Sequence, residues 1–335
     1  MIFFTMMVSG WISLVNGASV FSLPASMDKV VARNASEANS ATQIFWNTRL
    51  QKKKLFVDPA FKWKSLFTSL TMSDVGKEFP IAGMNEKGLV IHNVSKSQST
   101  ENQTLYQLQW LQMILDTSSD LASAIFHASS IAASLLGENA QFIVCDWTGE
   151  CGIFESHGIW KIRSGDEVSY PVLTESSYDE SLEFLSKHEG YGGELPIPQG
   201  VSSLERFVRM VFLSSRYDSS ESSLNFSFRL LDQISQPSTQ WNSVFHVRLR
   251  QLYFKKHDFN KTKWIQMEVL PVSCQTELIS WKIKTDEFGD QSKRGLPWTD
   301  EKANEFISNY PLFDENQKKA IVDFSLNQVN CEEEQ

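Results

Sequence analysis

The apolar and polar residues in the middle of the chain follow two different periods. Alternating apolar side chains predict strands over residues 88–94, 141–156 and 159–163. Apolar side chains spaced three and four apart follow Asp120 as far as Leu135, and they predict a helix that Asp120 caps. The mixed order of these elements favours an α+β fold over a regular repeat of strand, helix and strand.

Later segments continue the mixture of helices and strands. Ser202 and Glu205 have the spacing of a capping box, so a helix is expected to begin there. Residues 244–255 and 263–270 are two predicted strands, and the polar residues 257–260 are the predicted turn between them.

The first 17 residues have the character of a secretory signal peptide. No charged side chain precedes Asp28, and the apolar stretch from Ile2 to Val15 is short for a spanning helix of about 20 residues. Cleavage is expected after Gly17, which predicts a secreted or periplasmic protein with no membrane attachment after removal of the leader. An uncleaved anchor is the alternative, because the segment has no Lys or Arg.

The overall charge is negative, since 31 Lys and Arg face 40 Asp and Glu, a net charge of −9. This argues against a nucleic-acid partner held by a basic surface. Hydrophobic residues make up 41 %, with 23 Phe and 10 Trp, which is enough for a large core. The basic run at residues 52–54 is interpreted as a solvated face.

Four cysteines are present, and an oxidising compartment would favour bridges between them. Cys145 and Cys151 flank a short polar turn and could meet across a hairpin, but the sequence does not fix the pairing. Cys274 and Cys331 lie far apart in sequence, and no spacing typical of a metal site occurs. The histidines are scattered and are expected on the surface or as satisfied core residues: His92, His127, His157, His188, His246 and His257.

Generic catalytic and cofactor signatures are missing from the sequence. There is no Gly-x-Ser-x-Gly elbow, no Walker loop, no Gly-x-Gly-x-x-Gly and no His-Glu-x-x-His. We therefore expect no cofactor and no metal. These motifs alone indicate a secreted α+β globular protein and no particular reaction.

Five segments in order nevertheless resemble one family, the linear amide hydrolases that include choloylglycine (bile salt) hydrolase and penicillin V acylase. They are residues 80–90, 171–182, 190–193, 202–209 and 239–241. The match covers residues 18–286 as one domain and leaves residues 287–335 as a helical extension, in which Thr299 and Asp314 are expected helix caps.

The resemblance implies the N-terminal-nucleophile architecture, a four-layer αββα sandwich of two antiparallel sheets. It also implies a mechanism in which removal of a leader exposes a cysteine as the first residue. The free amine of that cysteine is the base for its own thiol, because nucleophile and base must lie within hydrogen-bond reach. Donor groups then hold the oxyanion and water releases the acyl enzyme.

The resemblance places Ala18 at the nucleophile position, or Ser19 if the register shifts by one residue. Ala18 has no nucleophilic atom, and the nitrogen of Ser19 is an amine only after cleavage behind Ala18. Arg33 matches an arginine near the nucleophile. Ser36 stands where an aspartate would contact the amine, and Glu37 follows one position later.

Glu175 stands where the family has an asparagine that supports the oxyanion, and a carboxylate there would repel a developing negative charge. Arg206 matches the second active-site arginine. Either arginine can equally be a structural ion-pair partner, and Glu175 with them can form a neutralised ion-pair cluster.

Three hypotheses follow from these residues. The first is a protein that has lost hydrolysis, keeps the fold and binds a small-molecule amide or acyl-amino ligand in the inherited pocket. The second is an active amidase with Ser19 as the nucleophile, assisted by Arg33 and Arg206, with Glu37 or Glu175 replacing lost partners. The third is a non-catalytic protein that uses its surface, including the C-terminal helices.

Overall fold

The computed structural model describes residues 18–23, 28–36, 42–95, 99–274, 277–308, 310, 313–326 and 331. The expected signal peptide, residues 1–17, and Glu37 lie outside the described residues, as does the side chain of Ser36.

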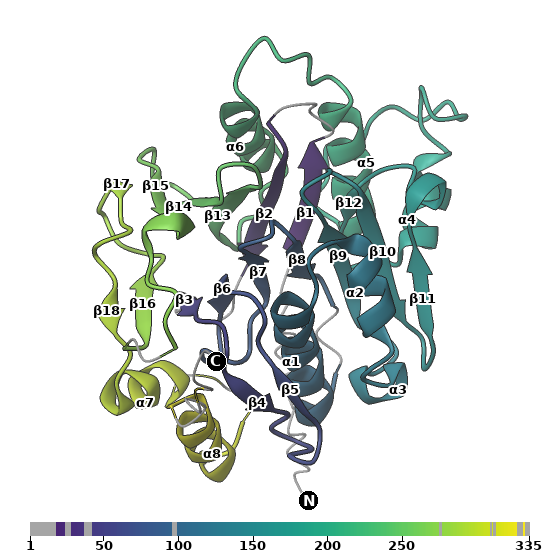
Figure 1. Ribbon diagram of the computed structural model, residues 1–335. Helices are drawn as coiled ribbons and strands as arrows, with labels where there is room; N and C mark the ends of the chain where they lie inside the picture. Colours follow the sequence, from purple (N-terminus) through teal and green to yellow (C-terminus); the bar gives the residue numbers. More distant parts are fainter. Residues whose placement is uncertain are drawn as a thin grey trace, which may run out of the picture.

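Two large β-sheets form the centre of the molecule (Figure 1). The first has seven strands, in spatial order β12 (Val172–Leu173), β1 (Ala18–Leu23), β2 (Val30–Ser36), β13 (Thr239–His246), β14 (Gln251–Lys256), β15 (Lys263–Gln266) and β17 (Gly289–Asp290). The pairing is antiparallel except between β15 and β17, which are parallel over two residue pairs. The expectation of purely antiparallel sheets is corrected at this edge strand.

The second sheet has nine strands and is antiparallel throughout. Its order is β11 (Trp160–Arg163), β10 (Cys151–Ser156), β9 (Gln141–Cys145), β8 (Val90–Asn93), β7 (Ala82–Asn85), β6 (Ser69–Ser73), β3 (Gln43–Asn47), β16 (Ile279–Lys282) and β18 (Leu296–Pro297). A separate hairpin pairs β4 (Lys52–Lys54) with β5 (Lys62–Lys64).

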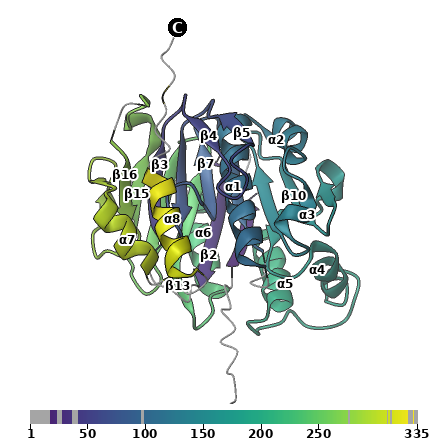
Figure 2. The same ribbon diagram turned by 90° about the horizontal axis from the view of Figure 1, so that it is seen from below.

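Helices cover the outer face of each sheet (Figures 1 and 2). Those of the first sheet are α4 (Tyr178–Leu185), α5 (Ser203–Ser214) and α6 (Ser223–Gln233). Those of the second are α1 (Glu101–Thr117), α2 (Leu121–Ala128), α3 (Ala133–Leu136), α7 (Asp300–Ser308) and α8 (Glu315–Leu326). Short 3-10 turns occupy Gly165–Glu167 and Met267–Val269. The described part of the chain contains no helix with the length and apolar character needed to cross a bilayer.

The inner faces of the two sheets pack against each other. Val20 and Val31 from the first sheet and Met84 and Ile143 from the second belong to one buried apolar cluster. Burial of such side chains stabilises the folded state by roughly 25 cal/mol per Å² of apolar surface removed from water. Helix, sheet, sheet and helix therefore form the αββα sandwich predicted from the resemblance.

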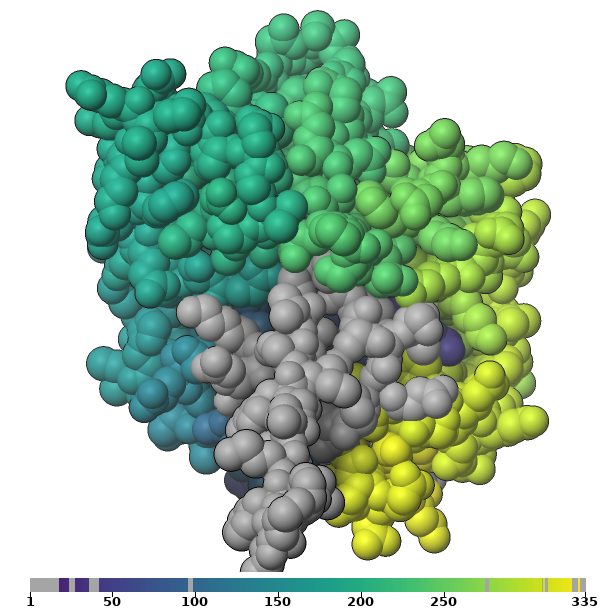
Figure 3. Space-filling view, turned by 180° about the vertical axis from the view of Figure 1, so that it is seen from behind, coloured from purple at the N-terminus to yellow at the C-terminus, as the bar shows by residue number. Residues whose placement is uncertain are grey.

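The C-terminal helices belong to the helical layer of the second sheet. Phe306 of α7 and Ile321 of α8 pack with Phe45 of β3 and with Leu105 and Leu108 of α1. The two expected caps are present, because Thr299 Oγ1 accepts from the nitrogen of Lys302 at 3.4 Å and Asp314 Oδ1 from that of Gln317 at 2.8 Å. Viewed from behind, the yellow C-terminal segments lie below the green segments that contain α6 (Figure 3).

All four cysteines are paired. Cys145 and Cys151 oppose each other across the β9–β10 hairpin and form a disulfide, the pairing that the sequence left open. Cys274 and Cys331 form the second disulfide despite a sequence separation of 57. This bridge joins the end of the chain to the body of the protein.

Two predicted elements differ from the structure. Residues 244–255 are the ends of two strands and the turn between them, in which Arg250 has a left-handed φ of 50°. The Arg250 side chain joins this turn to the loop between β7 and β8, since its Nε donates to Glu86 O and its Nη2 to Lys87 O, each at 2.8 Å. The helix predicted from Asp120 to Leu135 is broken after Ala128 and resumes as α3.

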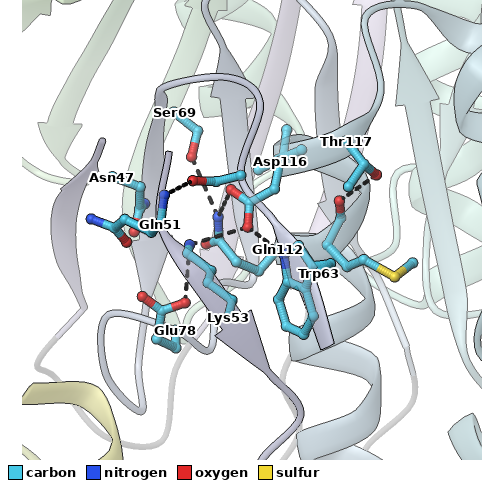
Figure 4. A network of polar contacts seen from close by, with 12 residues as sticks. Asn47, Gln51, Lys53, Trp63, Ser69, Glu78, Gln112, Asp116 and Thr117 are labelled. Atoms are coloured by element: carbon cyan, nitrogen blue, oxygen red, sulfur yellow. Dashed lines mark hydrogen bonds and ion pairs between the residues drawn. The ribbon is translucent and has the colours of Figure 1, made fainter. Parts of the chain in front are cut away.

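The basic run in β4 is a solvated face only in part. The side chain of Lys53 is fully buried, with its Nζ 3.1 Å from Glu78 Oε2 and 3.1 Å from Asp116 Oδ2 (Figure 4). Lys52 and Lys54 are exposed, because side chains alternate between the faces of a strand. Burial would raise the pKa of Glu78, but the charges of Lys53 and Lys77 lower it to about 2.

Candidate functional site

The β1–β2 hairpin positions Ala18, Ser19 and Arg33, three of the residues that the sequence resemblance singled out. Ala18 lies opposite Ala35, Ser19 opposite Asn34, and Val20 opposite Arg33. Opposed residues share a face and successive residues alternate. Ala18 and Arg33 therefore lie on the inner face of the first sheet, toward the second sheet, whereas Ser19 lies on the face toward the helices.

Arg33 is held on this inner face by contacts with both sheets. Its Nη1 donates to the carbonyl oxygen of Asn93, in β8 of the second sheet, at 2.7 Å. Its guanidinium carbon lies 5.9 Å from the ring centre of Trp241 in β13, which is a cation–π distance. Arg33 therefore links the two sheets.

His92, in β8, is fully buried close to Arg33. Burial lowers the pKa of its imidazole well below the usual value, and the charge of Arg33 lowers it further, so the ring is neutral. Neither ring nitrogen has a hydrogen-bond partner among the described residues. The expectation that every histidine is exposed or satisfied is wrong here, because the ring packs against Phe245 with centroids 5.5 Å apart.

On the opposite face of β1, Arg206 contacts Ser19. The observed capping box of Ser202 and Glu205 begins α5 one turn before Arg206, and this start directs Arg206 toward the sheet. Its Nη1 donates to Ser19 Oγ, and to the carbonyl oxygen of Ala18 at 3.3 Å. Ser19 is completely buried.

Glu175 completes this cluster from the segment that follows the edge strand β12. Its Oε2 accepts from Arg206 Nη2 at 2.5 Å, and the side chains of Arg206 and Glu175 are 3 % and 13 % exposed. Arg206 Nε donates to Val201 O at 3.1 Å. The amide oxygen of Gln236, in the orientation that satisfies its hydrogen bonds, lies 3.1 Å from Arg206 Nη1. Of the ion-pair cluster predicted as an alternative role for Glu175 and the two arginines, the pair between Glu175 and Arg206 is present.

The four candidate catalytic residues are thus divided between two faces. Ser19, Arg206 and Glu175 are in contact, and Arg33 lies on the other side of the hairpin. The strand alternation places the side chain of Arg33 on the other face of the sheet from that of Ser19. That both arginines assist Ser19 stays a prediction.

Sequence reasoning missed three residues of the site. Asn34 Oδ1 accepts from the backbone nitrogen of Ser19 at 3.1 Å. Gln141 Nε2 donates to the carbonyl oxygen of Glu175 at 3.3 Å, and His92 lies near Arg33. Asn34 could have been found as the residue next to Arg33, but no local pattern marks Gln141 or His92, which tertiary packing brings to the site.

This arrangement limits the chemistry of Ser19. A serine nucleophile needs a base within hydrogen-bond reach of its hydroxyl. Within the described part of the chain, the Ser19 hydroxyl contacts the Arg206 guanidinium and forms no hydrogen bond with a carboxylate or an imidazole. While Ala18 precedes Ser19 in the chain, the nitrogen of Ser19 is a peptide amide, and an amide is not a base.

Two stacked β-sheets between helical layers, with the hairpin described above at the site, define the N-terminal-nucleophile hydrolase fold. Solved structures with this arrangement include penicillin V acylase from Agrobacterium tumefaciens, which has a TM-score of 0.69 and 19 % identity and covers 84 % of this chain and 98 % of its own. The resemblance predicted from sequence is confirmed at the level of the fold.

Two structures of conjugated bile acid hydrolase from Clostridium perfringens, a mutant and a variant, are also similar. Their TM-scores are 0.62 and 0.61 and their identities 17 % and 16 %, and each covers 81 % of this chain and 98 % of its own. Comparison of the sequence with family models and with curated proteins gave no match.

Proposed function

We propose that this chain is a non-hydrolytic protein on an amide-hydrolase fold, which binds a small amide or acyl-amino compound without cleaving it. The observation that carries the proposal is the environment of the first two residues of β1. Ala18 offers no nucleophile, and the hydroxyl of Ser19 is buried against a guanidinium that is itself paired with Glu175. Loss of a nucleophile removes most of the rate in enzymes that depend on one.

The position of Glu175 also supports a loss of hydrolysis. Hydrolysis of an amide requires donors around the developing oxyanion. A carboxylate at that position places a negative charge next to the oxyanion, which is itself negative in the transition state. The charge of Arg206 cannot offset this repulsion, because Arg206 is already paired with Glu175.

Secretion or export to a periplasm is part of the proposal. The leader-like residues 1–17 support it, and so do the two disulfides, since such bridges persist in oxidising compartments.

An active amidase with Ser19 as its first residue is the second candidate, and one observation favours it. Asn34 Oδ1 lies 3.1 Å from the nitrogen of Ser19, so it would hold a free α-amine at that place. An α-amine with a pKa near 8 is a usable base, and Arg206 would stabilise negative charge on the hydroxyl oxygen.

The first residue of the mature protein distinguishes the two candidates. We expect terminal sequencing and intact mass of the exported protein to show a start at Ala18, which leaves Ser19 without an amine. A start at Ser19 would contradict the proposal in its present form and favour the amidase. The variant Ser19→Ala, expressed and sequenced in the same way, controls for an effect of the Ser19 hydroxyl on removal of the leader.

A further inference from the structure

We propose that Asn260, in the turn between β14 and β15, is an acceptor of an N-linked oligosaccharide. This inference goes beyond the binding of a small amide, and of the proposed function it rests only on export. An N-glycan acceptor is the asparagine of an Asn-x-Ser or Asn-x-Thr sequence in which x is not proline. Asn260, Lys261 and Thr262 form such a sequence. Whether it carries a glycan depends on where the fold places it.

The transfer of a glycan requires an accessible side-chain amide. The asparagine Nδ2 attacks C1 of the first sugar of an oligosaccharide that is linked to a lipid through a diphosphate. The bond between Nδ2 and C1 forms, the bond between C1 and the diphosphate oxygen breaks, and Nδ2 loses one proton to a base of the transferring enzyme. The lipid diphosphate leaves with the electron pair. The modified asparagine must lie at the surface, because a glycan is bulky and polar.

The turn at Asn260 meets this requirement. The side chain of Asn260 is exposed, and it forms no hydrogen bond within the described part of the chain. Thr262 is half-buried, and its hydroxyl is likewise without a hydrogen bond to a described residue. The turn is held through the backbone, since Thr262 O accepts from the nitrogen of Gly289 at 3.1 Å. Both side chains of the acceptor sequence are therefore available.

The surface beside this turn leaves room for an oligosaccharide. Asn260 and Thr262 line an open hollow of about 600 Å³, to which residues of α6 also contribute. The charged side chains in its wall are paired with one another, Arg229 with Glu221 and Lys255 with Asp232. A neutral, polar sugar chain is compatible with such a wall.

Two further sequences of the same type lie in strands, at Asn34 and Asn93. Asn34 is fully buried, and its Oδ1 accepts from the nitrogen of Ser19 at 3.1 Å. A glycan there is incompatible with the pairing of β1 and β2. Asn93 is half-buried, and the hydroxyl of its sequence, Ser95 Oγ, accepts from the nitrogen of Gln141 at 2.9 Å. The fold thus uses groups of both sequences.

The remaining two sequences begin at exposed asparagines in the first turns of helices, Asn102 in α1 and Asn225 in α6. Their hydroxyl groups are less available than that of Thr262. Thr104 Oγ1 donates to the carbonyl oxygen of Thr100 at 3.0 Å, and Ser227 is fully buried. Asn260 therefore combines an exposed amide with an unused hydroxyl, and we expect it to have the highest occupancy of the five asparagines.

The test is peptide mass spectrometry of the full chain, secreted from cultured insect cells with its expected leader. Peptide N-glycosidase in heavy-oxygen water converts each glycosylated asparagine into a labelled aspartate, so occupied positions are identified directly. We expect the label at Asn260 and none at Asn34. Thr262→Ala should abolish the label at Asn260, whereas the matched variant Thr262→Ser keeps a hydroxyl and should retain it.

The other outcomes separate this inference from the proposed function. Secreted protein that melts cooperatively and has no glycan at Asn260 would overturn the inference and leave export intact. A glycan retained in Thr262→Ala, or a higher occupancy at Asn102 or Asn225 than at Asn260, would overturn the role given to the Thr262 hydroxyl. A glycan on Asn34 would contradict its buried position. Retention of the whole chain inside the cell would contradict both export and the inference.

Discussion

Replacing Lys53 by methionine is expected to lower the free energy of unfolding by about 3–5 kcal/mol. Lys53 Nζ lies 3.1 Å from each of two carboxylates, on Glu78 and Asp116, and all three side chains are at most 1 % exposed. Removal of the ammonium leaves these carboxylates buried next to each other with Lys77 as the remaining cation. Water cannot solvate them at this depth, so the cost is that of an uncompensated buried charge.

The neighbouring lysine is the matched control. Lys54 lies on the same strand with its side chain in solvent, so Lys54→Met should change stability by no more than about 0.5 kcal/mol. Urea unfolding of the two variants and the wild type measures the difference. Equal midpoints for the two variants would show that the buried position of Lys53 is wrong.

Replacing Glu175 by alanine is expected to lower the free energy of unfolding by about 2–3 kcal/mol and the Tm by roughly 3–4 °C. The variant leaves the Arg206 guanidinium buried among neutral oxygens, from Ser19, Val201, Ala18 and Gln236. The loss of stability should be smaller than that of Lys53→Met, because Glu175 is partly exposed and forms a single ion pair.

A double variant identifies the cause of this loss. If an unpaired charge destabilises Glu175→Ala, then removal of the charge in Glu175→Ala with Arg206→Met should recover part of the stability. Glu189→Ala, at an exposed position, serves as the control and should melt like the wild type. A melt of Glu175→Ala indistinguishable from that of the wild type would exclude a stabilising ion pair.

Local sequence signals were sufficient for several elements near the site. The capping box at Ser202 and Glu205 predicted the start of α5, and with it the helical position of Arg206. The polar turn between Cys145 and Cys151 predicted the hairpin that their disulfide closes. Such features depend on residues within one turn of the chain, so the sequence carries them directly.

Features that depend on contacts between residues far apart in the sequence could not be predicted from local patterns. Arg33 and Ser19 lie on opposite faces only because Val20 pairs with Arg33, and a shift of one residue would exchange the faces. Lys53 appeared as part of a basic surface run, but its partner Asp116 lies in α1. The segment from Val244 onward appeared as one strand, because no glycine marks the turn at Arg250.

The resemblance supplied the fold, which periodicity alone did not. Periodicity indicated helices and strands in mixed order, but two stacked sheets were expected only from the five matching segments. The same resemblance showed that Ala18 and Glu175 stand where the hydrolases have other residues, a cysteine and an asparagine. The geometry then added Asn34, Gln141 and His92, which come from three different strands.

Amide hydrolysis by the mature, exported protein is the most direct test of the central claim that this chain binds without cleaving. The measurement follows release of amine from penicillin V, from conjugated bile acids and from N-acyl amino acids, with wild type and Ser19→Ala compared at equal concentration. The account predicts no release above the uncatalysed rate for either protein. Release by the wild type that is abolished in Ser19→Ala would contradict it and establish Ser19 as a nucleophile.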